Sequence, residues 1–117
     1  VFQGRLEASV TVQGLADRLS IALDRSPLVI GDGVVKSVAW CTGAGQGYID
    51  LAADVGADVY VTGEVSEQTA HVALERGIAF IGAGHHATER YGVQTVGSIA
   101  AEELGLSHEF IDIDNPA

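Results

Sequence analysis

The chain has 117 residues, of which 47% are hydrophobic and 19% are charged. This composition predicts a folded domain with a buried core and excludes a disordered chain. Sixteen acidic residues against six basic ones give a net charge of -10. That balance argues against nucleic acid or an anionic membrane surface as a partner, because both require clustered positive charge.

The sequence contains no membrane-spanning run, no signal peptide pattern and no pair of cysteines. No apolar run approaches the ~20 residues that cross a bilayer, and no basic segment precedes an apolar stretch as in a signal peptide. Cys41 is the single cysteine, which excludes an intrachain disulfide. We therefore expect a soluble cytoplasmic protein, with Cys41 as an inert, buried thiol at the end of an apolar run rather than a reactive one.

Short apolar runs and helical stripes alternate along the chain after an irregular start over residues 1–11. Thr11 is placed to cap the first helix, and Ser66 and Gly77 are placed to begin and end a later one. The expected order is helix 12–24, strand 27–30, turn 31–33, strand 34–41, helix 48–56, strand 58–63, helix 66–77, strand 78–84, helix 86–104 with a break near Gly92, and strand 108–113.

This alternation predicts the fold class. Short β-branched strands separated by helices indicate βαβ units, and hence an α/β domain with a mostly parallel sheet and helices on its faces. Ligands of such sheets gather at the carboxyl ends of the strands. Three loops leave those ends here: "TGAGQG" (42–47), "TGEVSE" (62–67) and "GAGHHATE" (82–89). The functional residues are expected in these loops.

The first loop has three glycines in a G-x-G-x-G spacing between a strand and a helix. Such glycines let backbone N–H groups approach an anion, which would make a small nucleotide- or phosphate-binding module. The spacing is not that of a dinucleotide-binding turn, and no Lys-Ser/Thr pair follows as in a P-loop. A tight turn that only connects two elements is an equally good interpretation.

The second loop places Glu64 at the end of a strand, and the helix after it carries His71. Glu64 has the chemistry to orient a water or a substrate, and it also suits the positive end of a helix dipole. His71 has the pKa range of a general acid or base, while the alternative is a helix histidine that simply packs on its neighbours.

The third loop carries His85 and Glu89, four residues apart. On a helix these two side chains differ by about 40° in direction and share a face. An imidazole and a carboxylate are common ligands of first-row metals, although stable sites use at least three protein groups. His86 points about 100° away. The alternative to a metal pair is a capped helix start with polar surface groups.

Four segments in this order, "WCTGAGQGYID", "TGEVSEQTAHVA", "GHHATERYG" and "FIDIDNPA", resemble the GTP cyclohydrolase 1 type 2 homologue family of Nif-three-like proteins. The resemblance runs from about Gly4 to Ala117. It implies a cytoplasmic α/β protein that assembles into toroidal hexamers with two divalent ions per subunit. The mixed N/O ligands suit Zn, Mn or Fe alike.

The resemblance further implies that His85 and Glu89 are metal ligands, with Glu64 and His71 nearby in catalytic roles on substrate or proton transfer. It implies a metal-dependent hydrolase acting on GTP or on a related cyclic amide or phosphoester. A metal-binding or assembly protein without turnover is the alternative within the family. Family members also carry a paired-histidine motif and an aspartate in an N-terminal half that has no counterpart here. We therefore expect residues 1–117 to form one domain, the C-terminal part of a longer protein.

Overall fold

Three parallel strands form the centre of a five-stranded sheet in the computed structural model, which describes residues 1–116. All residues of two of these strands, Val59–Thr62 and Ala79–Gly82, are buried, as expected for strands covered on both faces. The parallel strands are β3 (Val34–Cys41), β4 (Val59–Thr62) and β5 (Ala79–Gly82); β1 (Phe2–Thr11) pairs antiparallel with β3 at one edge, and β2 (Leu28–Ile30) pairs antiparallel with β5 at the other.

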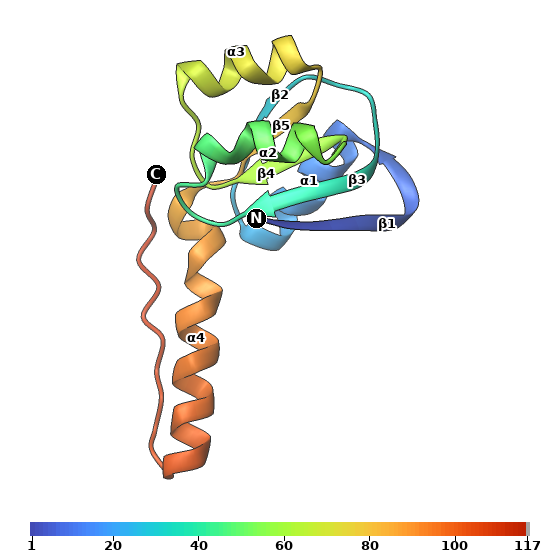
Figure 1. Cartoon of the computed structure of the whole chain (residues 1–117). Helices are drawn as coiled ribbons and strands as arrows, with labels where there is room; N and C mark the ends of the chain where they lie inside the picture. The colour runs from blue at the N-terminus through green and yellow to red at the C-terminus, as the bar shows by residue number, and fades with distance from the viewer. Residues whose placement is uncertain (117) are drawn as a thin grey trace.

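Helices cover the two faces of this sheet (Figure 1). Helix α1 (Val12–Leu23) packs on one face, where Val59 and Val61 join its core. Helices α2 (Ile49–Asp54) and α3 (Glu67–Arg76) pack on the other face, where Tyr60 lies between them and the sheet. The period of two in β4 thus supplies both cores, and the predicted α/β class with a mostly parallel sheet is confirmed.

The predicted helix caps are confirmed. The Thr11 hydroxyl accepts a hydrogen bond from the Gly14 N–H at 3.0 Å and so begins α1. Ser66 and Thr69 form a capping box that begins α3. Gly77 ends α3 with φ 64°, a conformation that glycine adopts without a steric penalty.

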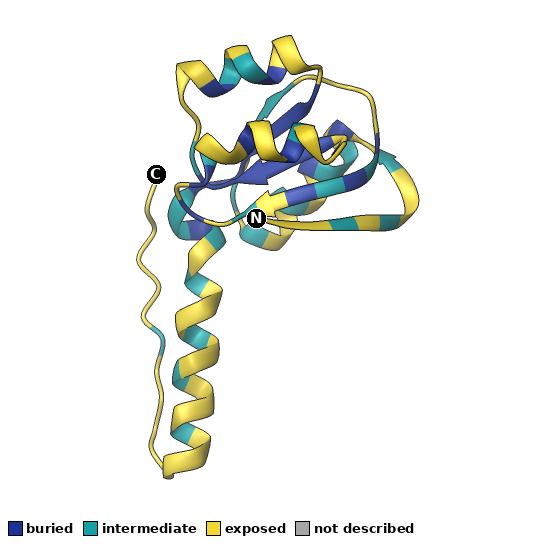
Figure 2. Cartoon of the chain, in the orientation of Figure 1, coloured by how far each residue is buried: buried dark blue, intermediate teal, exposed yellow. Residues whose placement is uncertain are grey.

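The last helix, α4 (His85–Leu104), begins under the carboxyl ends of the central strands and then leaves the body of the domain (Figure 1). Only Ala87 in its first turn is buried, and most of the helix is exposed (Figure 2). The helix continues through Gly92, so the expected break there is wrong. A single glycine lowers helix stability by only about 1 kcal/mol relative to alanine.

Two further expectations are wrong for the same physical reason, which is the availability of a strand partner. The irregular start is in fact β1, because residues 2–11 find the free edge of β3. Residues 108–113 form no strand, because this segment runs beside α4 and away from both sheet edges (Figure 1). Alternation of apolar residues predicts a strand only where an edge is available to pair with it.

Within the described residues, none of the helices combines the length and the apolar character needed to cross a membrane.

The amino ends of β3 and β4 are joined by the carboxylate of Asp58. Its Oδ2 accepts hydrogen bonds from the N–H groups of Lys36 (2.8 Å) and Ser37 (2.7 Å). The two bonds lower the pKa of Asp58 below its ordinary value of 3.8, and the bond from Ser37 has the larger effect. A group whose pKa is lower in the folded state stabilises the fold above its unfolded pKa, and this stability is lost as pH falls through the folded pKa.

We therefore expect Asp58→Asn to lower the free energy of unfolding by about 1 kcal/mol at neutral pH, since a neutral acceptor makes weaker bonds. The difference from wild type should shrink as pH falls below about 4. Urea denaturation at neutral pH and at a pH below about 4 measures this difference. Asp32→Asn is the control for losing one exposed negative charge. An equal difference at neutral and acidic pH would contradict this account of Asp58.

Candidate metal centre

The structure brings together Glu64, His85 and Glu89 at the carboxyl end of β4. Glu64 follows β4, and His85 is the first residue of α4. The imidazole of His85 lies between two carboxylates: its Nδ1 is 2.6 Å from Glu64 Oε1, and its Nε2 is 3.0 Å from Glu89 Oε2. The four-residue spacing of His85 and Glu89 therefore places them side by side, as the sequence predicts.

The two carboxylates favour the protonated form of His85. The hydrogen bond to Glu64, followed by the charge of Glu89, raises the pKa of His85 above 6.5. A divalent ion at Nε2 would replace the proton there, because only a deprotonated ring nitrogen is a ligand. The three side chains are between 38% and 52% exposed, so an ion would have access from solvent.

The His85–Glu89 pair fits a shared metal ion. Two ligands at 2.0–2.2 Å from one ion, at angles between octahedral and tetrahedral, lie about 2.9–3.5 Å apart, and the Nε2–Oε2 separation of 3.0 Å is within this range. Glu64 lies on the opposite side of the ring and does not face the same position. Accordingly, residues 1–116 contain no group of three or more His, Cys, Asp or Glu side chains arranged to hold a metal. His85 and Glu89 are thus a candidate pair of ligands and, within the described residues, not a complete site.

The "TGAGQG" loop holds this pair in place through Gly43. The Gly43 carbonyl accepts hydrogen bonds from the N–H groups of Gly63 (3.0 Å) and Glu64 (3.2 Å), which ties the loop to the end of β4. The Gly43 N–H donates to the Thr88 hydroxyl at 3.0 Å, which ties it to the first turn of α4. One residue thus connects the two segments that carry the site.

This packing leaves no room for a side chain at Gly63, and at Gly43 a side chain would require the Glu89 carboxylate to move. A Cβ at Gly63 would lie 2.6 Å from the Gly43 carbonyl oxygen and 2.7 Å from His85 Cα. A Cβ at Gly43 would collide with the Glu89 carboxylate and lie 3.2 Å from His85 Nε2, and Gly43 also has φ +66°. The glycines therefore permit close approach of the loop, the strand end and α4.

The same hydrogen bonds argue against the loop as an anion pocket. The Gly43 N–H donates to the Thr88 hydroxyl. The Gly45 N–H donates to the Thr62 hydroxyl and to the Gly43 carbonyl. An anion site at a glycine-rich turn needs such N–H groups directed at the ligand. The connecting role of this loop is the better supported of the two interpretations.

The remaining candidate residues lie elsewhere. The His71 side chain is 68% exposed on α3, and its Nε2 lies 4.0 Å from Glu67 Oε1. Within residues 1–116, no hydrogen bond or ion pair joins it to His85 or Glu89. His86 contacts Asp112 at 2.8 Å and so turns away from His85. Cys41 is half-buried, and its Sγ lies 3.7 Å from the Thr42 carbonyl oxygen.

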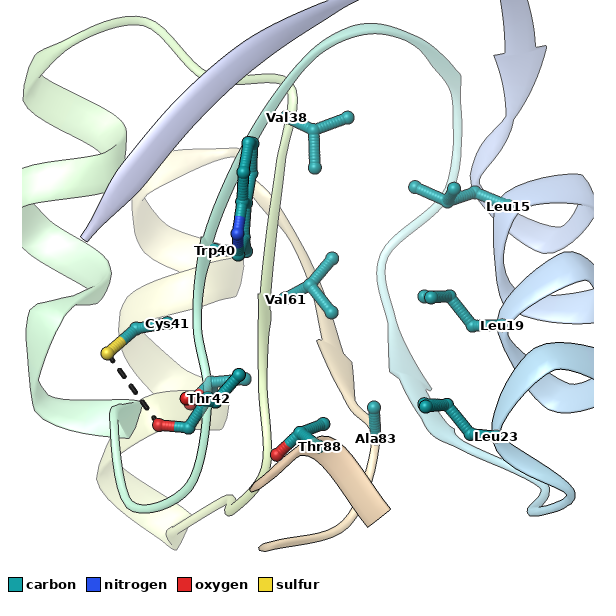
Figure 3. Close-up of a pocket in the computed structure, with 11 residues that line it drawn as sticks. Leu15, Leu19, Leu23, Val38, Trp40, Cys41, Thr42, Val61, Ala83 and Thr88 are labelled. Atoms are coloured by element: carbon teal, nitrogen blue, oxygen red, sulfur yellow. Dashed lines mark hydrogen bonds between the residues drawn. The ribbon is translucent and has the colours of Figure 1, made fainter. Parts of the chain in front are cut away.

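An apolar cavity of about 260 Å³ lies between α1 and the sheet, close to the start of α4 (Figure 3). Leu15, Leu19 and Leu23 line it from α1, facing Val38 and Val61. Thr88 borders one end of this cavity and also accepts from the Gly43 N–H. His85 and Glu89 are not among the residues that line this cavity.

Two residues at the site were not predicted from the sequence, namely Thr88 and Gln46. Thr88 holds Gly43, and the Gln46 side-chain amide donates to Glu64 Oε2 at 3.1 Å. The position of Thr88 three residues after His85 offers a weak signal, since residues at i and i+3 are neighbours on a helix. Gln46 has no such signal, because its contact depends on how the loop folds back on β4.

Comparison with known proteins agrees with this fold. The family model for Duf34/NIF3 (NGG1p interacting factor 3) matches residues 1–116. The protein named "GTP cyclohydrolase 1 type 2 homolog" from Haemophilus influenzae is 50% identical over 117 residues, covering 97% of this chain and 47% of the relative. The chain belongs to the Duf34/NIF3 family.

Solved structures lead to the same assignment. The protein ybgI, described as of unknown function, superimposes with a TM-score of 0.93 at 48% identity, over 98% of this chain and 48% of that one. TTHA1606 from Thermus thermophilus gives a TM-score of 0.84 at 33% identity, over 97% and 47%. The chain thus spans about half the length of the relatives it matches.

The close packing at Gly43 predicts a specific sensitivity. We expect Gly43→Ala to displace the Glu89 carboxylate from His85 and to lower the free energy of unfolding by about 1 kcal/mol, because of the positive φ. Gly47→Ala is the matched control, since a Cβ there has no atom within 4 Å. Urea denaturation of the two variants measures the effect. Equal stability of both would show that the loop accommodates a side chain at position 43.

Proposed function

We propose that this protein binds a divalent metal ion through His85 and Glu89 and is a metal-dependent hydrolase. The proposal rests on one observation, the pair formed by His85 Nε2 and Glu89 Oε2 at 3.0 Å with Glu64 behind the ring. The names of the relatives, "GTP cyclohydrolase 1 type 2 homolog", support GTP or a related cyclic amide or phosphoester as the substrate class. The single cysteine suits a cytoplasmic location.

The chemistry of these residues supports Zn, Mn or Fe. One imidazole nitrogen and one carboxylate oxygen are ligands that all three ions accept. A carboxylate behind a metal-binding histidine fixes the ring orientation and strengthens the other nitrogen as a ligand. Glu64 supplies this carboxylate at Nδ1. Further ligands have to come from outside residues 1–116, and by family resemblance they complete a site for two ions.

A bound ion of this kind supplies Lewis-acid polarisation of a substrate oxygen and lowers the pKa of water. The residues of this chain have separate tasks: His85 and Glu89 hold the ion, and Glu64 orients His85. The role in proton transfer predicted for Glu64 is thus replaced in this proposal by a positioning role. His71 is kept in this proposal as a candidate for substrate contact or proton transfer, on an exposed position of α3.

The ligand assignment is tested by metal content. In the protein at the full length encoded by its gene, we expect His85→Ala and Glu89→Ala each to lower bound Zn, Mn or Fe by about tenfold or more at limiting metal, since each removes a direct ligand. His71→Ala should retain the wild-type content. Elemental analysis after dialysis measures this, and equal metal in all four proteins would refute the assignment. Hydrolysis of GTP and of a panel of cyclic amides and phosphoesters then tests turnover.

An assembly role is the second candidate, and α4 is the observation that favours it. Val93, Val96 and Ile99 are between 52% and 67% exposed on a helix that leaves the body of the domain. Apolar side chains gathered on one exposed element indicate an interface. We propose that α4 packs against a second copy of the protein, within the hexamer that the family resemblance implies.

This assembly predicts a change in mass. We expect the double variant Val96→Asp, Ile99→Asp to dissociate the full-length oligomer, because a buried unpaired charge is strongly unfavourable at an interface. Ile21→Asp, at a residue 85% exposed on α1, is the control. Light scattering measures the mass of each protein. An oligomer that survives the double substitution would place the interface elsewhere.

A further inference from the structure

Gln46, Glu64 and His85 are joined by hydrogen bonds, and this series ends at the proposed metal ligands His85 and Glu89. Its Nε2 donates to Glu64 Oε2 at 3.1 Å, while Glu64 Oε1 faces His85 Nδ1 at 2.6 Å. The two oxygens of the Glu64 carboxylate are thus used by two different partners. A carboxylate held at both oxygens has one orientation, whereas a carboxylate held only at His85 rotates about its last side-chain bond.

The backbone that carries Gln46 is anchored to the core. The preceding residue, Gly45, donates its N–H to Thr62 at 3.1 Å and accepts at its carbonyl from the Tyr60 hydroxyl at 2.7 Å. Tyr60 and Thr62 are fully buried on β4. A Cβ at Gly45 would lie 2.7 Å from the Thr62 hydroxyl, so the loop is seated directly on the strand. Gln46 therefore extends from a rigid base.

The Gln46 amide also has a feature that packing alone does not explain. Because an ionised carboxylate only accepts hydrogen bonds, the NH₂ group has to face Glu64. The opposite atom, Oε1, is then buried without a hydrogen-bond partner among the described residues. A buried acceptor without a partner is unfavourable, and an apolar side chain of similar size would avoid it. The contact with Glu64 is the hydrogen bond that the described residues give this side chain.

We infer that Gln46 is a positioning residue for the metal pair: it fixes the carboxylate of Glu64, and Glu64 in turn fixes the His85 ring with Nε2 directed beside Glu89. This inference rests on the proposed metal-binding role of His85 and Glu89. It assigns a function to the loop "TGAGQG" that is neither anion binding nor simple connection.

A double-mutant cycle on metal affinity tests the inference in the full-length protein. We expect Gln46→Leu to weaken Zn binding by about three- to tenfold and Glu64→Gln by about 10–100-fold. Mutation of the residue that hydrogen-bonds to a metal ligand typically lowers metal affinity by the larger of these factors. The double variant should lie within about twofold of Glu64→Gln, because Gln46 acts only through Glu64. The matched control is Gln68→Leu, because Gln68 borders the same polar cavity as Gln46. Competition with a chelator measures each affinity, and Gln46→Met replaces Gln46→Leu should the latter not fold.

A second readout uses metal-free protein. We expect the proton shared by His85 Nδ1 and Glu64 to give a slowly exchanging NMR signal in wild type and in Gln68→Leu, and a faster exchanging one in Gln46→Leu. Wild-type affinity and exchange in Gln46→Leu would overturn the inference, as would affinity losses that multiply in the double variant. If His85→Ala leaves metal content unchanged, the proposed function fails, while the exchange measurement still decides the role of Gln46.

Discussion

The carbonyl oxygen of Gly43 accepts hydrogen bonds from Gly63 and Glu64, and the rest of the site depends on this contact. It brings the loop after β3 against the end of β4, in the space left by two residues without side chains. The hydrogen bond from Gly43 to Thr88 connects the first turn of α4 to the same loop. Three segments that lie far apart in the sequence then meet at the carboxyl edge of a parallel sheet, which is where such folds place their ligands.

The consequence of this packing is an imidazole held between two carboxylates. Glu64 and Glu89 approach opposite nitrogens of His85, so Nδ1 faces Glu64 and Nε2 faces Glu89. Gln46 extends the same support one step further back into the loop. In the proposed metal-binding role the arrangement is a half-site, because two protein ligands do not complete the coordination of a first-row ion. The match to about half the length of the relatives is consistent with ligands contributed from elsewhere.

The sequence predicted the parts of this molecule that depend on local pattern. The central strands, the helices, the Thr11 and Ser66 caps and the shared face of His85 and Glu89 all follow from short-range periodicity and capping chemistry. It failed where a neighbour in space decides the outcome. Residues 2–11 are a strand because the edge of β3 is free, and residues 108–113 are not, because they lie beside α4. The contacts of Gln46 and Thr88 likewise depend on tertiary packing.

The most direct test of the account is the identity of the His85 nitrogen that binds metal. Nitrogen-15 NMR of labelled histidine in the full-length protein, with and without Zn, resolves the two ring nitrogens. The account predicts that the Nε2 resonance of His85 moves on metal binding, while Nδ1 keeps its proton and its bond to Glu64. Binding through Nδ1, or no change at either nitrogen under saturating Zn, would contradict it.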